Sequence, residues 1–231
     1  MKRIAILCAL LLPLYVHSQQ IVEGGFFLGF ANYQGDLSDN PIVLKETKKS
    51  YGGFVRLHYE DKFKIRGNVY YGFIGGNDAN ADSNKKNRGW KFDGTVLEVA
   101  ITGEYHPLGR SRAGSTGIFR RQISPYIATG LGYTFTNIDL VVPSSDSGMF
   151  PEAEDVDKFI TVPFMFGVRI DLHEHVSISG EWGWRATFSD YLDDVSQNGN
   201  PNRNDWYLFV GGSVSYFFGS FSPDFFKGKE Y

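Results

Sequence analysis

Residues 63–74 read FKIRGNVYYGFI, and this stretch indicates the fold more directly than any other part of the chain. Its odd-numbered positions hold apolar side chains or glycine: Phe63, Ile65, Gly67, Val69, Tyr71 and Phe73. Its even-numbered positions begin with charged and polar side chains, Lys64, Arg66 and Asn68. Successive side chains of a β-strand point to opposite faces. The stretch therefore predicts a strand with one apolar and one polar face.

Seven further segments alternate in the same way, at residues 22–31, 51–59, 96–106, 126–136, 159–171, 176–188 and 206–217. None of the eight apolar faces contains Asp, Glu, Lys or Arg, whereas the opposite faces carry charges and many glycines. Small residues on a charged face are typical of a narrow barrel interior, and strands of this length can cross a bilayer at a tilt. The pattern predicts an all-β fold, an eight-stranded antiparallel transmembrane β-barrel.

The connections between these segments alternate in length. Long links at residues 32–50, 75–95, 137–158 and 189–205 alternate with tight ones at residues 60–62 and 172–175. Outer-membrane barrels have long outer loops, short periplasmic turns and aromatic side chains at both ends of their apolar faces. Tyr51 and Tyr133 mark one end of these faces, and Tyr59 and Tyr105 mark the other. We therefore expect the chain in the bacterial outer membrane.

The first residues have the layout of a secretory signal peptide. Lys2 and Arg3 precede an apolar run that Pro13 interrupts, and this run is too short for a transmembrane helix. We expect a signal peptide over residues 1–18, a barrel over residues 19–218 and a periplasmic tail over residues 219–231. The only cysteine, Cys8, lies in the expected signal, which excludes disulfides and thiolate sites from the mature chain.

The charge of the mature chain gives no attraction to nucleic acid. Of the 23 basic side chains, Lys2 and Arg3 would leave with the signal, so 21 remain against 26 acidic ones and the net charge is −5. Nucleic-acid binding is therefore not expected.

The polar faces of the strands carry five basic and five acidic side chains, and we expect these to form an interior charge network: Arg56, Lys64, Arg66, Arg169 and Arg185 with Glu23, Glu98, Glu104, Asp171 and Glu181. In an eight-stranded barrel the interior is just wide enough for side chains to fill it. The sequence therefore predicts a paired polar core without a conducting pore. His58 and His106 share a layer with Glu104, and we interpret them as interior histidines without metal or cofactor.

Two groups of loop residues are interpreted as motifs that order the outer loops: Tyr33, Gly35 and Asp36 after the first strand, and Asp190, Tyr191, Asp193 and Asp194 after the seventh. Three close aspartates could also bind a hard cation such as calcium, but their spacing does not match a calcium loop. Carboxylates that accept backbone N–H bonds would order the loop equally well.

Three segments together resemble the PorG-type barrels associated with type IX secretion and gliding. They are Tyr33-Gln34-Gly35-Asp36-Leu37, Ser124-Pro125-Tyr126 with Gly130 and Gly132, and the stretch RATFSDYLDDVS at residues 185–196. The resemblance implies an outer-membrane barrel that contacts a periplasmic ring of lipoprotein and partner subunits of the secretion machine.

One inner connection, residues 107–124, is too long for a turn and contains no acidic residue. We interpret it as a partner-binding segment, because arginine and aromatic side chains are enriched at interface hot spots: its candidates are Arg110, Arg112, Ile118, Phe119, Arg120 and Arg121. The arginines could instead contact lipid phosphates of the inner leaflet. The expected function is a non-enzymatic anchor or assembly partner of the secretion machine. A lipopolysaccharide-modifying or lipid-binding barrel and an adhesin-like surface barrel are the alternatives.

Overall fold

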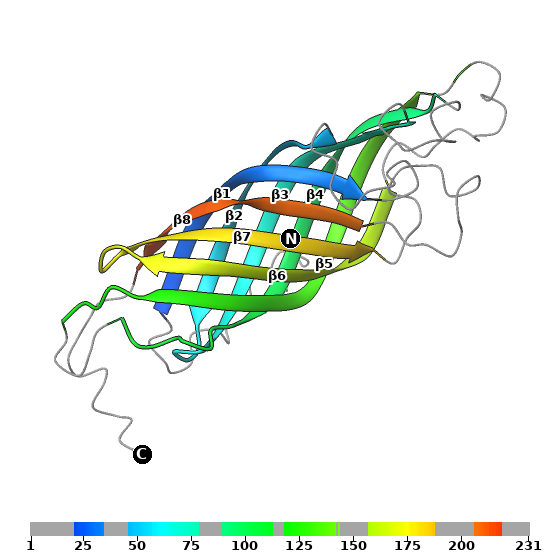
Figure 1. Ribbon diagram of the computed structural model, residues 1–231. Coiled ribbons are helices and arrows are strands. Elements are labelled where there is room, and N and C mark those ends of the chain that lie inside the picture. Colours follow the sequence, from blue (N-terminus) through cyan, green and yellow to red (C-terminus); the bar gives the residue numbers. More distant parts are fainter. Residues whose placement is uncertain are drawn as a thin grey trace, which may run out of the picture.

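The computed structural model describes residues 21–34, 46–78, 89–112, 118–141, 143, 157–187 and 206–218. These residues form eight strands: β1 (Ile21–Gln34), β2 (Lys48–His58), β3 (Phe63–Asn77), β4 (Lys91–Tyr105), β5 (Ile123–Val141), β6 (Asp157–Asp171), β7 (Val176–Thr187) and β8 (Trp206–Phe217). Consecutive strands pair antiparallel, and β1 also pairs with β8, so the sheet closes into a barrel (Figure 1). The predicted eight-stranded antiparallel β-barrel is confirmed. Within the described ranges, no helix has the length and apolar character needed to cross a membrane.

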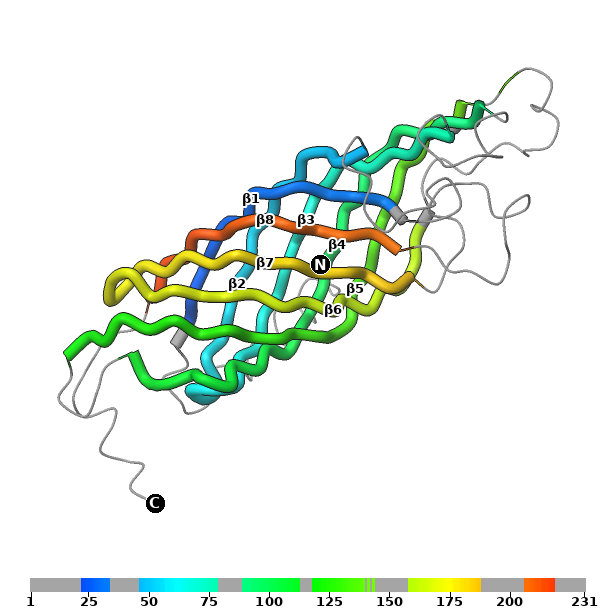
Figure 2. The backbone as a smooth tube through the Cα atoms, in the orientation of Figure 1, coloured from blue at the N-terminus to red at the C-terminus, as the bar shows by residue number. Residues whose placement is uncertain are grey.

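The two ends of the barrel differ, as the backbone trace in Figure 2 shows. One end, which we call the short-turn end, holds the connections at residues 59–62, 106–122 and 172–175. The Glu60 N–H donates to the Phe63 carbonyl (3.0 Å) in the first of these, and the Leu172 N–H donates to the Val176 carbonyl (3.0 Å) in the third. At the opposite end, which we call the long-loop end, β1, β3, β5 and β7 finish and β2, β4, β6 and β8 begin.

Several strands continue beyond their predicted bounds at the long-loop end. β4 begins at Lys91 and pairs there with Val141 of β5, several residues outside the segments expected from the sequence. β1 likewise extends to Gln34, so Tyr33 is a strand residue opposite Tyr207 of β8 and not a loop residue. Its buried ring packs edge-on against Phe92 (4.8 Å between centroids). Pairing with the neighbouring strand continues where the alternation of apolar and polar residues has already faded.

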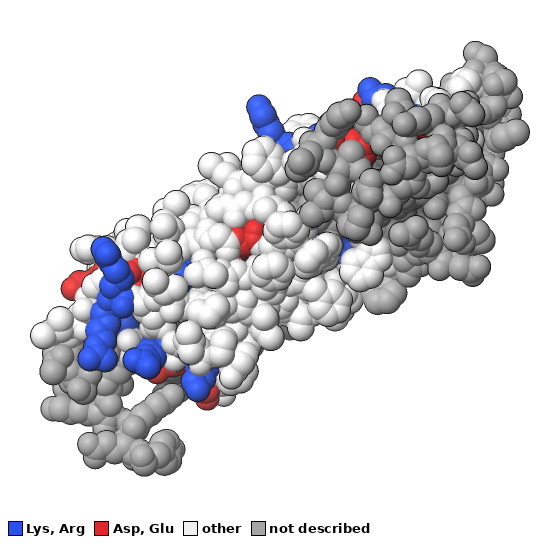
Figure 3. Space-filling model, viewed as in Figure 1, with Lys and Arg blue, Asp and Glu red and all other residues white. Residues whose placement is uncertain are grey.

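The outer surface of the barrel wall is apolar. Leu28 is 71% exposed and Ile101 is 67% exposed, and further exposed side chains on the predicted apolar faces are Phe26, Val55, Ile65, Val69, Val99, Leu131, Phe164 and Val214. In the space-filling view the wall is mostly white, and Lys and Arg side chains stand at its short-turn end (Figure 3). The predicted outward apolar face therefore holds along the wall.

A hydrophobic core fills the long-loop half of the interior: Phe27, Ala31, Tyr33, Tyr70, Ile74, Trp90, Phe92, Val96, Phe159, Tyr207 and Phe209. Phe27, Tyr70 and Tyr207 are at most 1% exposed. Because a water-filled channel would expose these rings, the barrel is closed at their level. The pattern of residues predicted polar and small side chains throughout the interior, so this aromatic core is a correction.

Inward glycines leave the space that the aromatic rings occupy. A Cβ atom on Gly25 would overlap the ring of Phe54, and a Cβ atom on Gly52 would overlap the ring of Tyr70. The rings and glycines alternate on one face, and together they fill the narrow interior.

Candidate functional site

The short-turn half of the interior is filled by one alternating chain of ion pairs, which we call the charge ladder. In order it consists of Glu181, Arg66, Glu104, Arg56, Glu23, Arg169, Asp171 and Arg112. Six strands and the 106–122 connection supply these side chains, and none is more than 8% exposed. The ladder therefore ties most of the barrel circumference together from the inside.

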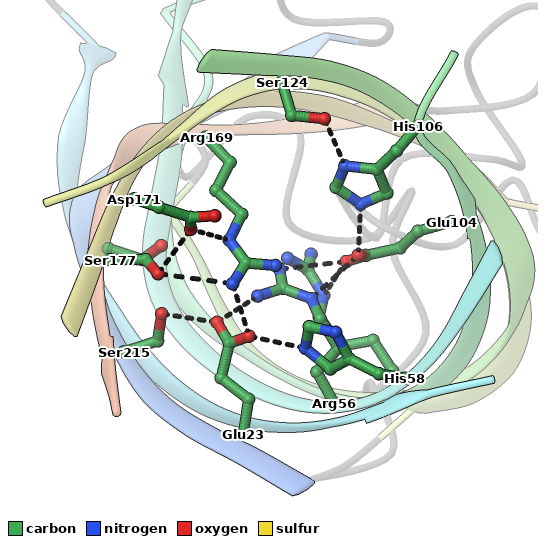
Figure 4. A network of polar contacts seen from close by, with 12 residues as sticks. Glu23, Arg56, His58, Glu104, His106, Ser124, Arg169, Asp171, Ser177 and Ser215 are labelled. Atoms are coloured by element: carbon green, nitrogen blue, oxygen red, sulfur yellow. Dashed lines mark hydrogen bonds and ion pairs between the residues drawn. The ribbon is translucent and has the colours of Figure 1, made fainter. Parts of the chain in front are cut away.

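The centre of the ladder is drawn in Figure 4, where the guanidinium groups of Arg56 and Arg169 lie among three carboxylates. Arg56 Nη1 lies 2.6 Å from Glu23 Oε1, and Arg56 Nε lies 2.8 Å from Glu104 Oε2. Arg169 Nη2 lies 2.8 Å from Glu23 Oε2, and its Nε lies 3.0 Å from Asp171 Oδ1. Each of these carboxylates serves two arginines, which compensates the cost of burying the charges.

The two ends of the ladder are formed differently. At one end Arg66 joins Glu104 (Nε to Oε1, 3.2 Å) to Glu181 (Nη1 to Oε1, 2.8 Å). At the other end Arg112 reaches in from the 106–122 connection, ion-pairs with Asp171 (2.7 Å) and donates to the Glu174 carbonyl (2.9 Å). Its guanidinium also lies 4.6 Å from the ring centroid of Phe217.

A separate ion pair lies next to the hydrophobic core. Arg185 Nε is 3.2 Å from Glu98 Oε1, and the Tyr207 hydroxyl donates to Glu98 Oε2 (2.7 Å). Arg185 also lies over the ring of Phe209, 4.7 Å from its centroid. With this pair, the structure brings nine of the ten side chains of the expected interior network into ion pairs.

Lys64 is the exception. It is 7% exposed, yet among the described residues no carboxylate lies within ion-pair distance of its ammonium group. The nearby carboxylate of Glu104 pairs with Arg56 and Arg66 instead. Arginine reaches across the barrel and offers several N–H donors in a rigid fork, which favours it over lysine at a shared carboxylate.

Ser124, His106 and Glu104 form a hydrogen-bonded set at the short-turn end that resembles a nucleophile, a base and an orienting carboxylate. Ser124 Oγ lies 3.0 Å from His106 Nδ1, and His106 Nε2 lies 3.1 Å from Glu104 Oε2. The alternation of residues did not connect Ser124 with the histidine, because His106 follows β4 and Ser124 lies near the start of β5, and only the closed barrel brings them together.

The surroundings of this set do not suit catalysis. His106 is fully buried and Ser124 is 4% exposed, so a substrate has no access to the hydroxyl oxygen. His106 lies one residue beyond the end of β4, and its burial lowers the pKa of its imidazole to about 4. A base this weak accepts a proton poorly at neutral pH. We assign the three side chains a structural role.

The second interior histidine is also held by a carboxylate, since His58 Nε2 lies 2.7 Å from Glu23 Oε2. A carboxylate only accepts hydrogen bonds, so Nε2 carries the proton. Across the described part of the chain, no group of three or more His, Cys, Asp or Glu side chains is arranged to hold a metal ion.

The 106–122 connection separates the residues that the sequence analysis grouped as partner-binding. Arg112 is buried in the charge ladder and is not available to a partner. Ile118 is 70% exposed, and Arg110, Arg120 and Arg121 are exposed as well. Phe119 is partly buried, with its ring centroid 6.4 Å from that of His173.

Backbone hydrogen bonds hold the described parts of this connection, residues 106–112 and 118–122, against the end of the barrel. The Arg120 N–H donates to the Arg112 carbonyl (2.8 Å), and the Asp171 N–H donates to the Gln122 carbonyl (2.9 Å). The Gln122 side chain donates to the Leu108 carbonyl (2.8 Å). The exposed side chains of the connection therefore stand on an ordered base.

Other expectations fall outside the described residues. These are the signal peptide over residues 1–18, the tail over residues 219–231 and the loop residues Gly35, Asp36, Asp190, Tyr191, Asp193 and Asp194.

The chain matches the profile of a known protein family. The profile of one family matches residues 2–226, nearly the whole sequence. The chain belongs to DUF6089, a domain of unknown function. No match to a curated protein was found.

Solved structures similar to this DUF6089 protein include other β-barrels. The N-terminal β-barrel domain of OprF from Pseudomonas aeruginosa has 14% identity and a TM-score of 0.45, with 87% of this chain and 100% of that chain covered. Neisserial surface protein A has 12% identity and a TM-score of 0.47, with 86% and 97% covered. The outer membrane protein OprG from Pseudomonas aeruginosa has 12% identity and a TM-score of 0.44, with 88% and 100% covered.

Proposed function

We propose that this chain is an outer-membrane β-barrel that neither conducts solutes nor catalyses a reaction, and that it anchors periplasmic subunits of a type IX secretion machine. The short-turn end faces the periplasm, because short turns lie on that side of outer-membrane barrels. The periplasmic ring lipoprotein and its partner subunits are the expected binding partners, in keeping with the resemblance to PorG-type barrels.

The outward face of the strands supports the membrane location. Large apolar side chains such as Phe26 (78% exposed), Leu28 and Ile101 cover the wall. In water this surface would far exceed the apolar patches that soluble monomers expose, whereas in lipid it is the preferred surface. A closed sheet also leaves no strand edge with unpaired backbone groups inside the bilayer.

The described parts of the 106–122 connection, residues 106–112 and 118–122, are the observation that carries the docking proposal. They present the exposed Arg110, Ile118, Arg120 and Arg121 on a base that Arg112 fixes inside the barrel. Side chains on backbone that is already held in place lose less conformational entropy on binding than those of a loose segment. The combination of apolar and guanidinium groups suits an interface with an acidic protein surface.

The test is purification of the native membrane protein with its partners. Ile118→Ala combined with Arg120→Ala should abolish recovery of the periplasmic subunits, because both side chains are exposed at the proposed interface. Arg112 stays in place, so the charge ladder is preserved. Lys49→Ala combined with Tyr51→Ala, two exposed residues of β2 toward the long-loop end, is the matched control and should recover the subunits normally.

Both double variants must insert as folded barrels for the comparison to count. If Ser replacements at Arg110, Ile118, Arg120 and Arg121 together leave the recovered subunits unchanged, docking by this connection is refuted. If no subunit is recovered with the parent protein under mild solubilisation, the anchor role itself is refuted.

A further inference from the structure

Lys64 has no partner for its charge within the described protein. It is the second residue of β3 and lies opposite His58 on β2 and Glu104 on β4. The side chain points inward at the short-turn end and is only 7% exposed. Among the described residues its ammonium group has neither an ion pair nor a hydrogen bond. A mostly buried charge without a counter-charge is costly, and the ammonium nitrogen is not among the fully enclosed polar atoms, so a partner can reach it from solution.

The neighbouring carboxylates cannot supply that partner, because their oxygens are already occupied. Glu104 Oε1 faces Arg56 Nη2 (3.1 Å) and Arg66 Nε (3.2 Å), and Glu104 Oε2 faces Arg56 Nε (2.8 Å) and His106 Nε2 (3.1 Å).

Glu23 is equally engaged. Its carboxylate oxygens are in contact with donor groups of Arg56, Arg169, His58 and the Ser215 hydroxyl. A carboxylate offers about four lone-pair sites, so neither Glu104 nor Glu23 has room for Lys64.

The charge count of the described interior agrees with this geometry. Arg112 enters from the connection and adds a sixth cation to Arg56, Lys64, Arg66, Arg169 and Arg185. Five carboxylates face them: Glu23, Glu98, Glu104, Asp171 and Glu181. The two other buried carboxylates among the described residues, Glu46 and Asp78, accept backbone N–H groups of Asn77 and Trp90 at the long-loop end. The surplus positive charge therefore falls on Lys64, the one cation that the carboxylates leave out.

We propose that Lys64 is the anchor of an anion site in the mouth of the barrel at its short-turn end, and that the site takes a phosphate or sulfate group. An ammonium group donates up to three hydrogen bonds, and a tetrahedral oxyanion supplies the matching acceptors. The side chain of His58, opposite Lys64, is 14% exposed, which marks the route from solution. The anion neutralises the surplus charge, and the site operates whether or not a partner protein docks.

The test measures thermal unfolding of the full-length barrel in maltoside micelles, with phosphate, sulfate or chloride added at constant ionic strength. Phosphate and sulfate should raise the unfolding midpoint of the parent in a saturable way, by about 5–10 °C at 100 times the dissociation constant, and chloride should not. Lys64→Met should lose this response, and Lys64→Arg should keep it. Lys62→Met, which removes an exposed lysine two residues away, is the matched control and should respond like the parent.

Lys64→Met is expected to fold, because it replaces an unpaired buried charge with an apolar side chain of similar volume. Binding of inorganic phosphate measured by calorimetry provides a second readout, and it should be present in the parent and absent in Lys64→Met. An equal response of the parent and Lys64→Met, or the absence of any oxyanion response in the parent, overturns the proposal.

A further arm identifies the source of the phosphate group. The unfolding midpoints of the parent and Lys64→Met are compared in phosphate-free buffer, once in maltoside micelles and once in phospholipid vesicles. If the midpoint of the parent exceeds that of Lys64→Met only in the vesicles, the phosphate group belongs to a lipid headgroup. If the two midpoints differ only after inorganic phosphate is added, the phosphate group is a free anion.

Discussion

At the scale of single residues, identical side chains of this barrel have different roles because their surroundings differ. Arg112 and Arg120 belong to the same connection, yet the first is buried against Asp171 and the second is exposed. A buried arginine with a carboxylate partner is held in place by the cost of leaving either charge unpaired, whereas an exposed arginine gains little from any surface ion pair. Burial therefore decides which arginines stabilise the barrel and which remain for partners.

The charge ladder predicts a large effect at Glu104, which joins Arg56, Arg66 and His106. Glu104→Gln should lower the free energy of unfolding by about 3–5 kcal/mol, because it leaves buried guanidinium groups without a counter-charge. Urea titration in liposomes measures this value. Glu60→Gln, the same change in an exposed turn, should have almost no effect, and equal losses in the two variants would contradict the ladder as a stabilising unit.

At the scale of elements, each strand separates two environments. In β4 the side chains of Val99 and Ile101 point outward and are exposed, while those of Glu98 and Ala100 point inward and are buried. The register is defined strongly, because a slip of one residue would place the charges of the ladder on the apolar wall. The strand length and the alternation together suit a bilayer on one side and a packed core on the other.

The lipid-facing register predicts a penalty that depends on depth. Val99→Arg, near the middle of the apolar wall, should cost about 2–4 kcal/mol of folding free energy in liposomes. Thr95→Arg, on the same face of β4 but closer to the long-loop end, should cost about 0–1 kcal/mol. Folding titrations of both variants measure the difference. A similar cost at the two positions would show that the wall is not surrounded by hydrocarbon.

At the scale of the whole molecule, the interior is filled from one end to the other. The aromatic core closes the long-loop half, and the charge ladder laces six strands and one connection in the short-turn half. Every strand pairs with two neighbours, so unfolding has to break the whole ring of pairings.

This architecture predicts a barrel that resists SDS at room temperature and passes no ions. On gels, the folded protein should migrate differently before and after boiling, and in planar bilayers it should show no stable conductance. Phe27, Tyr70 and Tyr207, each at most 1% exposed, leave no water path at their level. A steady open conductance of the parent protein would overturn the closed interior.

The sequence alone determined the features that repeat locally. Alternation with a period of two identified all eight strands, their outward faces and the inward placement of Arg56, Arg66 and Arg169. These properties depend only on which neighbours along the chain share a face, so a single strand contains the information. The same pattern underestimated the lengths of β4 and β5, because pairing between the two strands continues at the long-loop end after the alternation has faded.

Only the tertiary structure decided which inward side chains meet. Arg56 of β2 reaches Glu104 of β4 across the interior, and Arg112 enters from a connection that the sequence analysis had assigned to partners. The inward aromatic rings share their faces with the charges, so alternation could not separate the core from the ladder. Contacts across a closed barrel depend on strand register, stagger and the space that glycines leave, and none of these is encoded in one strand by itself. For that reason only the contacts of the closed barrel show that Lys64 lacks a counter-charge.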